Sequence, residues 1–338
     1  MWYIDNYKRE EVRHMEPIIF DRSDGQDLRI NMISPWLKRQ FGSKVVKLSL
    51  DGGFTCPNRD GTKGIGGCLF CSESGSGDMA SSITEHAAAN EIEAALDRQI
   101  ELLSDKWPDA KYIAYFQSHT NTYAPVSELK RKFEPVLTRP DVVGIAIATR
   151  SDCLPDEVLD YLEELNRRTF LWVELGLQTI HDSTAKAMNL CHYLSDYDDA
   201  FQKLTARGIR VVTHLILGLP GETPGMMKES VRYACSKTGP DGHPLLFGLK
   251  LHMLNVVRGS GMAKAMPDYV PFASMDEYID LLIDLLEQIP PQITMHRISG
   301  AAPRSTLIAP EWSYRKRTIL NTVHKEMRQR NTWQGKGL

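Results

Sequence analysis

Short β-branched runs alternate with longer amphipathic stretches along most of this chain, beginning at about residue 45. Strands that alternate with helices of roughly ten or more residues are typical of βαβ units and of a parallel sheet. We expect strands over residues 45–50, 112–117, 142–149, 171–178, 211–218 and 247–256, and helices over residues 85–104, 127–137, 155–168, 195–207, 223–235 and 275–288. The pattern predicts an α/β fold, and six consecutive units favour an open, partial (β/α)6 TIM-like barrel over a short doubly wound sheet.

The barrel pattern divides the chain into three parts. Residues 1–44 form an N-terminal extension of mixed charge, residues 45–290 the partial barrel, and residues 291–338 a basic C-terminal extension. This last part has nine Lys and Arg residues against two acidic ones, a local net charge of +7, so the remainder carries −10 of the total of −3. Such asymmetry suggests an anionic partner at one end of the protein.

The bulk composition excludes several classes of protein. No apolar run approaches the length of a membrane span, and the N-terminus lacks a basic-then-apolar signal pattern, so we expect a cytoplasmic protein with no membrane partner. Six cysteines in 338 residues are too few for a disulfide scaffold. In such a chain a Cys-x-x-Cys pair is more often metal-binding or redox-active.

Cys56, Cys68 and Cys71 stand in one glycine-rich loop after the first expected strand. Three thiolates can hold three irons of a [4Fe–4S] cube and leave the fourth open, whereas a structural zinc site usually has four ligands. The loop offers no fourth Cys or His, so we favour a cluster whose open iron binds and cleaves S-adenosylmethionine (SAM). A zinc knuckle is the alternative. The remaining cysteines are interpreted as small buried hydrophobes: Cys153, Cys191 and Cys235.

Polar residues occupy strand positions that would face the barrel interior. Side chains alternate along a strand, and the apolar alternate positions of the fourth strand would pack on helices, which directs Glu174 and Gln178 inward. Other candidates, on inward positions or at strand ends, are Gln117, Arg150, His214, Gly218, Lys250 and His252. Burying charge without a partner costs several kcal/mol. The positions therefore imply a polar ligand, with a self-satisfied network of core residues as the alternative.

Several motifs together resemble the radical SAM superfamily, and most closely its YhcC/YtqA-type family, whose core is similar to the radical SAM domain of the Elongator catalytic subunit. The matching stretches are residues 50–61, 67–77, 115–123, 173–178, 214–222 and 303–313. The first gap between the cysteines is longer than in the commonest radical SAM spacing, Cys-x3-Cys-x2-Cys. The longer gap also occurs in Elongator-like domains.

The resemblance implies a [4Fe–4S] cluster, held by Cys56, Cys68 and Cys71, that cleaves SAM to a 5′-deoxyadenosyl radical. It implies that Phe70 lies near the adenine and that Gln117 recognises the methionyl amine. Further residues expected at the SAM site are Arg150, Glu174, Gln178, His214 and Gly218. Lys250 and His252 are candidates for contact with the substrate or for a proton relay. The chemistry also calls for a one-electron donor such as flavodoxin or ferredoxin.

The resemblance to Elongator implies a tRNA-modifying enzyme that acts at or near C5 of a wobble uridine. A basic run in the C-terminal extension could lie on tRNA phosphates: Arg315, Lys316, Arg317, Lys325, Arg328 and Arg330. A solvated helical face is the alternative interpretation of that run. Two other functions stay open: a radical SAM enzyme for a small molecule or a peptide, and a non-catalytic zinc-binding scaffold.

Overall fold

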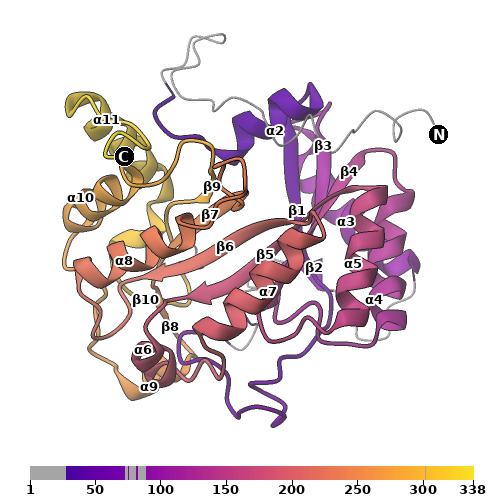
Figure 1. Ribbon diagram of the computed structural model, residues 1–338, viewed down its shortest axis with the longest axis horizontal. Coiled ribbons are helices and arrows are strands. Elements are labelled where there is room, and N and C mark those ends of the chain that lie inside the picture. The colour runs from indigo at the N-terminus through magenta and orange to yellow at the C-terminus, as the bar shows by residue number, and fades with distance from the viewer. Residues whose placement is uncertain (1–27, 73–74, 76–80, 83–88, 301) are drawn as a thin grey trace.

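A curled parallel sheet forms the centre of the protein (Figure 1). The computed structural model describes residues 28–72, 75, 81–82, 89–300 and 302–338. The eight strands of the sheet follow the order β2-β1-β3-β4-β5-β6-β7-β9, and every pairing between them is parallel. Their bounds are β1 (Val45–Asp51), β2 (Ser81–Ser82), β3 (Lys111–Phe116), β4 (Val142–Arg150), β5 (Phe170–Gln178), β6 (Arg210–Leu217), β7 (Gly248–Met253) and β9 (Thr294–Arg297). The expected partial barrel is therefore confirmed.

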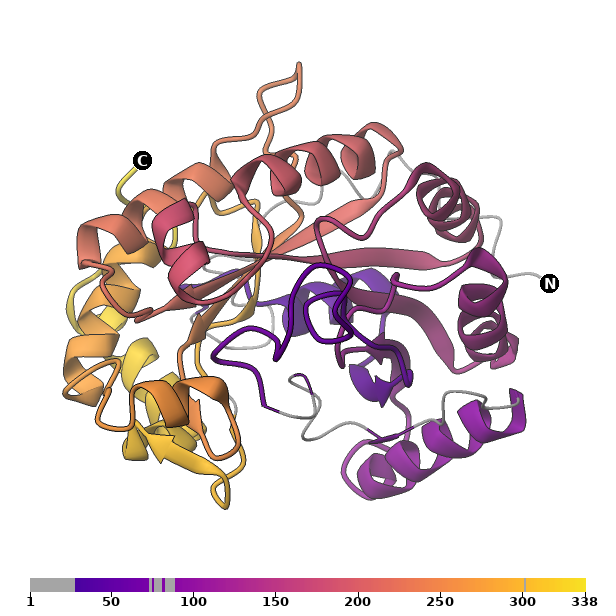
Figure 2. The ribbon, with the colours of Figure 1, turned by 90° about the horizontal axis from the view of Figure 1, so that it is seen from below.

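Helices cover the convex side of the half-barrel (Figure 2). Those that follow the main strands are α3 (Ala89–Ser104), α4 (Val126–Phe133), α5 (Asp156–Arg168), α7 (Leu194–Ala206), α8 (Pro224–Cys235) and α10 (Met275–Leu286). The outward residues of the strands, such as Val173 and Leu175 of β5, join the apolar faces of these helices in the main core. Residues 1–27 of the expected N-terminal extension, and residues 85–88 of the first expected helix, lie outside the described residues.

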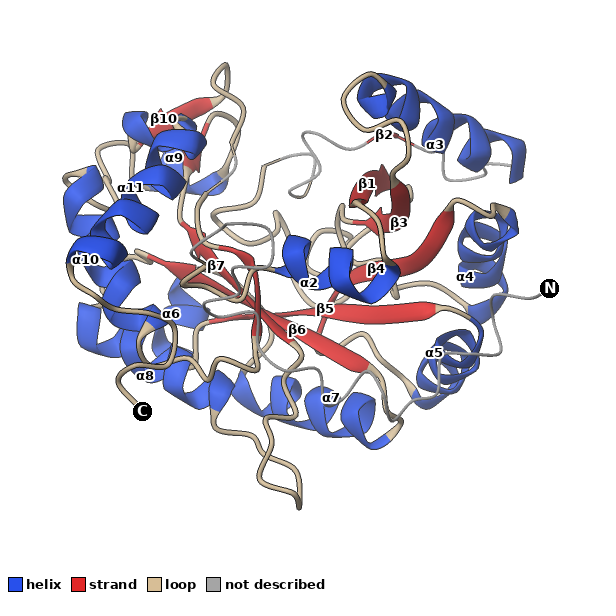
Figure 3. Ribbon diagram, turned by 90° about the horizontal axis from the view of Figure 1, so that it is seen from above, coloured by secondary structure: helices blue, strands red, loops and turns tan. Residues whose placement is uncertain are grey.

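The N-terminal end of the half-barrel is closed by a helix that the sequence pattern did not predict, α2 (Ile33–Phe41). Trp36 of α2 packs on Phe170, with ring centroids 6.0 Å apart, and Phe41 meets the same ring at 5.4 Å. Trp172 and Val212 complete this apolar floor inside the sheet. Figure 3 shows α2 lying across the strands. Polar inward side chains can therefore face a ligand only above this floor.

The C-terminal extension is integrated into the fold. Its residues 294–297 form β9, which pairs with β7 and adds a strand to the six expected from the sequence. It also contains β10 (Leu307–Ala309), paired with β8 (Val256–Val257), a short 3-10 turn η2 (Glu311–Tyr314), and α11 (Lys316–Gln329). The apolar face of α11 joins the main core through Ile319, Val323 and Met327. Among the described residues, no helix has the length and apolar character needed to cross a membrane.

Candidate functional site

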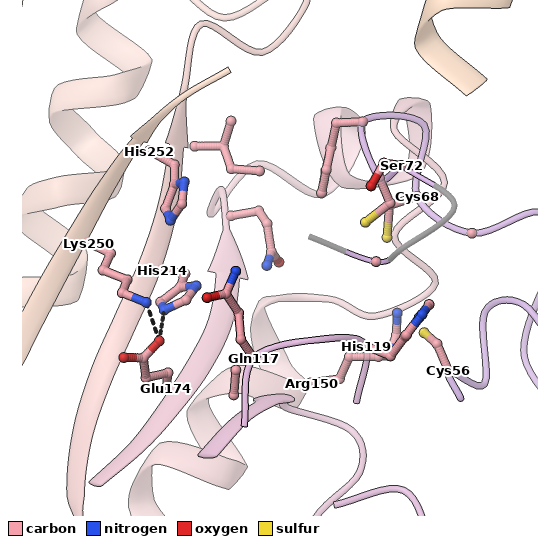
Figure 4. A pocket seen from close by; sticks show the side chains of 18 of the residues that line it. Cys56, Cys68, Ser72, Gln117, His119, Arg150, Glu174, His214, Lys250 and His252 are labelled. Atoms are coloured by element: carbon pink, nitrogen blue, oxygen red, sulfur yellow. Dashed lines mark hydrogen bonds and ion pairs between the residues drawn. The ribbon is translucent and has the colours of Figure 1, made fainter. Parts of the chain in front are cut away.

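A cavity of about 460 Å³ opens at the carboxyl ends of the strands. This volume lies within the usual range of ligand pockets, roughly 300–1,000 Å³. The three thiols of the cysteine loop line one side, and polar side chains of β5, β6 and β7 line the other (Figure 4). Carboxyl ends of parallel barrel strands are where such folds place their chemistry. The cavity is therefore the candidate site.

The cysteine loop is held in place by backbone and side-chain hydrogen bonds. Gly67 N–H donates to Asn58 O at 2.8 Å, and Cys71 N–H donates to Cys68 O at 3.0 Å. Leu69 connects the loop to two other segments of the chain. Its N–H donates to Met188 O at 3.0 Å, and its carbonyl accepts from Met262 N–H at 2.7 Å. Gly67 has a φ of 78°, a left-handed conformation that favours glycine. These contacts fix the loop at the edge of the cavity.

Cys56, Cys68 and Cys71 are unbridged and line the same cavity. A hydrogen bond with Cys71, followed by burial, raises the pKa of the Cys68 thiol well above its usual range. Iron that displaces the proton would convert such a thiol into a thiolate ligand. Within the part of the chain that the structure describes, no three His, Cys, Asp or Glu side chains are grouped so that they could hold a metal ion. In a [4Fe–4S] cube each thiolate binds a different iron, so the three thiols around one cavity fit that donor set.

Gln178 is the residue that most clearly indicates a ligand. Its backbone has a φ of 63°, which for a residue other than glycine costs about 1 kcal/mol or more. Its side chain lines the cavity, and its Oε1 atom is buried with no hydrogen-bond partner among the described residues. A Cβ atom on Gly176 would lie 2.5 Å from Gln178 Nε2, so glycine at position 176 provides the space that the Gln178 side chain occupies. A buried amide oxygen without a partner is unfavourable unless a ligand donates to it.

His119 is a lining residue that the sequence pattern did not identify. It has a φ of 56°, and its Nδ1 atom is buried without a hydrogen-bond partner in the described structure. Burial, followed by the charge of Arg59, lowers the pKa of His119. The sequence feature that could have identified His119 is its position two residues after Gln117. Gln117 also lines the cavity, as expected. Phe70 lines the cavity as well and packs against an apolar cluster around Met188.

Arg150 reaches the cavity but is occupied by protein partners. Its guanidinium donates two hydrogen bonds of 2.9 Å to Asp152, one of 2.8 Å to Leu190 O and one of 3.2 Å to Cys191 O. Burial alone would raise the pKa of Asp152, but hydrogen bonds and charge from Arg150, together with Lys63, lower it to about 2. Arg150 therefore connects the end of β4 to the segment beside the cysteine loop.

Glu174 lies at the centre of a buried network rather than free in the cavity. Its carboxylate accepts from Lys250 Nζ, from His214 Nε2 at 3.0 Å and from Trp172 Nε1 at 3.1 Å. Lys47 Nζ of β1 lies 3.7 Å from the same carboxylate. Glu174 and Lys250 are each 1% exposed. The inward direction of these side chains is as expected, and the network matches the alternative of core residues that satisfy one another.

The electrostatics of this network favour an ionised carboxylate. Burial alone would raise the pKa of Glu174, but the charges of Lys250 and Lys47 and the hydrogen bond with His214 hold it well below its usual range. Burial, followed by the charge of Lys250, lowers the pKa of His214 to about 4, so this imidazole is neutral near pH 7. His252 faces the cavity beside it, with ring centroids 5.5 Å apart.

Several predicted residues lie apart from the cavity. Gly218 is not among the lining residues, because it is packed under Pro271 and Phe272, and its carbonyl accepts from Tyr269 OH at 2.9 Å. Of the basic run, Lys316 lines the cavity. The others lie on the exposed surface of α11 and the residues that flank it: Arg315, Arg317, Lys325, Arg328 and Arg330. Arg330 is already paired with Asp280 at 2.5 Å and with Glu326 at 3.3 Å.

Comparison with known proteins gives a consistent family assignment. Residues 56–234 match the family described as the Radical SAM superfamily, and residues 247–329 match the Radical_SAM C-terminal domain. The chain is 46% identical to YtqA of Bacillus subtilis over 309 residues, which cover 91% of this chain and 92% of that protein. It is 39% identical to YhcC of Escherichia coli K12 over 285 residues, which cover 84% and 87% of the two chains.

A more distant similarity covers part of the chain. Over 166 residues, 48% of this chain and 28% of the relative, it is 29% identical to Elongator complex protein 3 of Schizosaccharomyces pombe. Among solved structures, the archaeal Methanocaldococcus infernus Elp3 with an N-terminal deletion superposes with a TM-score of 0.62 at 18% identity. The superposition covers 86% of this chain and 64% of that one. At this identity the structural match shows a shared fold.

Proposed function

The chain belongs to the radical SAM superfamily, and on that premise we propose that this enzyme acts on tRNA, at or near C5 of a wobble uridine. Enzymes of the superfamily use a [4Fe–4S] cluster and SAM, so the zinc scaffold considered from the sequence is set aside. A one-electron donor such as flavodoxin or ferredoxin belongs to the same proposal, because SAM cleavage consumes an electron.

The residues of the cavity fit the two cofactors. Cys56, Cys68 and Cys71 would hold the cluster, and Gln178 Oε1, which has no hydrogen-bond partner among the described residues, would accept a hydrogen bond from SAM. When bound, a cluster with an open iron supplies the electron that cleaves SAM to a 5′-deoxyadenosyl radical, which abstracts a hydrogen atom from the substrate. The protein would contribute position and an apolar surround: Phe70, within the cysteine loop, packs against the apolar cluster around Met188, and the apolar floor around Trp172 lies below the cavity.

The observation that supports an RNA substrate is the place where the basic helix begins. Lys316, the first residue of α11, lines the cavity, and like Arg315 and Arg317 on either side it is exposed. An RNA strand whose phosphates bind these cations would extend to the cavity. The partial similarity to Elongator complex protein 3 points in the same direction. Arginine and lysine on phosphates provide affinity that is independent of sequence and sensitive to salt.

The RNA proposal predicts salt-dependent binding of bulk tRNA to the reconstituted enzyme. Each lost phosphate contact reduces the slope of log affinity against log salt by roughly 1. We therefore expect the slope to become shallower by roughly 3 when Arg315, Lys316 and Arg317 are all replaced with Ala. Fluorescence anisotropy with labelled tRNA at several salt concentrations measures it.

A matched control removes the same charge from helices on the outer side of the barrel, by replacing Lys130, Arg167 and Lys203 with Ala. These cations are paired with acidic neighbours, and the slope should stay as in the wild type. Absence of tRNA binding at low salt would end the RNA proposal and leave a small molecule or a peptide as the substrate. Mass spectrometry of tRNA nucleosides from a deletion strain then identifies the modified position.

Gln178→Gly separates ligand binding from stability. Glycine accepts the left-handed backbone, so we expect thermal unfolding at a temperature no lower than that of the wild type. Loss of one hydrogen bond of about 1–1.5 kcal/mol should weaken SAM binding about tenfold. Calorimetric titration of the reconstituted protein with SAM measures the effect. Unchanged SAM affinity would show that Gln178 does not contact this cofactor.

A further inference from the structure

Two cations on one wall of the cavity have no acidic partner among the described residues. Arg297 is the last residue of β9, and Lys316 is the first residue of α11; both line the cavity. No carboxylate within the described structure forms an ion pair with either of them. Among the described residues that line the cavity, Glu174 is the one acidic residue, and it already pairs with Lys250 and Lys47.

The two cations are close enough to affect each other. Partial desolvation, followed by the positive charge of Arg297, lowers the pKa of Lys316. Arg297 also lies beside Lys250, its register partner on β7. Arg297 is half-buried and Lys316 is exposed, and like charges held close together are unfavourable unless an anion lies between them. Both cations stand at the end of a secondary-structure element, so the backbone of β9 and α11 fixes their positions.

This wall is distinct from the cofactor side of the cavity. β9 is one edge strand of the sheet, whereas β1, the strand that leads into the cysteine loop, lies next to the edge strand at the other end, β2. Figure 4 likewise shows Lys250 and His252 on the side away from Cys56 and Cys68. A SAM carboxylate bound at the open iron would lie on the cysteine side. The cations on the far wall are therefore available to a group of the substrate.

We propose that Arg297 and Lys316 bind a phosphate group of the nucleotide that enters the cavity. A guanidinium can bind two phosphate oxygens at once, and a lysine ammonium adds a point charge. The inference rests on the proposed RNA substrate and deepens it, because it places one backbone phosphate inside the cavity rather than on the outer surface of α11. His252, on the neighbouring strand, faces the same space.

Calorimetric titration of the reconstituted enzyme with uridine monophosphate and with uridine tests the phosphate site. In the wild type we expect the monophosphate to bind at least about tenfold more tightly. Arg297→Gln should remove this preference, Lys316→Gln should reduce it, and Arg297→Lys should retain part of it. Lys203→Gln, a charge-matched control on α7, should retain all of it.

Equal affinity for the two ligands in the wild type, or a preference that survives both Gln substitutions, overturns the phosphate site. Tighter binding of succinate than of uridine monophosphate also overturns it and assigns the wall to a small carboxylic acid. Bulk tRNA binding distinguishes the two proposals. If salt-dependent tRNA binding persists without the monophosphate preference, the RNA proposal stands and the cavity phosphate fails. If the preference holds without tRNA binding, the site stands and the RNA proposal fails.

Discussion

Replacing any one of Cys56, Cys68 and Cys71 with Ala abolishes the cluster and with it all cleavage of SAM. Each thiolate binds a different iron of a [4Fe–4S] cube, so two remaining ligands leave two irons without a protein donor. All three thiols line one cavity and none is held in a disulfide, so each is available to iron. Visible absorbance after anaerobic reconstitution measures the cluster, and chromatography of 5′-deoxyadenosine measures SAM cleavage.

The other cysteines provide the matched control. Cys235 is buried in the outer core, and Cys191 lies beside the loop, where a Cβ on Gly64 would come 2.8 Å from its sulfur. Cys235→Ala and Cys191→Ala should both retain the cluster and SAM cleavage. Loss of the cluster in Cys191→Ala would place a fourth thiol on the iron and remove the open coordination site. A cluster retained in any of the three ligand variants would contradict the ligand assignment.

Glu174→Gln should reduce the free energy of unfolding by about 3–5 kcal/mol, because it leaves the ammonium of Lys250 buried without a counterion. The double variant Glu174→Gln with Lys250→Met removes both charges of the buried pair. It should recover most of the loss, as buried pairs generally do when replaced together. Urea unfolding of the wild type, the two single variants and the double variant completes the cycle.

The same variants decide what the carboxylate of Glu174 is for. If the network is structural, the single variants lose stability and the double variant regains it. Strictly additive losses in the cycle would show that the two residues are not coupled. A tenfold loss of SAM affinity in Glu174→Gln at wild-type stability would instead assign the carboxylate to the cofactor, as the resemblance to the superfamily implies.

The half-barrel and its polar interior could be predicted because both depend on local patterns. Alternation along β5 places Val173 and Leu175 against the helices, and the opposite parity directs Glu174 inward. The cysteine spacing predicts the ligand loop without knowledge of the fold. The inward direction of a side chain does not reveal which residues it contacts, however. The pairing of Glu174 with Lys250 depends on the register of β5, β6 and β7, which no local pattern specifies.

The features that escaped prediction are short or depend on contacts distant in sequence. β9 has four residues after a Pro-Pro pair, so it shows no strand-length alternation, and with it the position of Arg297 was missed. α2 has only nine residues, and its role is visible only through its packing on Phe170. Gly218 looked suited to close approach by a ligand. Its left-handed φ of 83° instead serves a turn packed under Phe272.

A cluster on Cys56, Cys68 and Cys71 should leave one iron open to SAM within this cavity. Electron paramagnetic resonance of the reduced, reconstituted enzyme, recorded with and without SAM, measures whether SAM reaches that iron. We predict the signal of a single [4Fe–4S] cluster per chain that changes when SAM is added, followed by 5′-deoxyadenosine once turnover is allowed. A cluster signal that SAM leaves unchanged, or a protein that takes up one zinc ion and no iron–sulfur cluster, would contradict it.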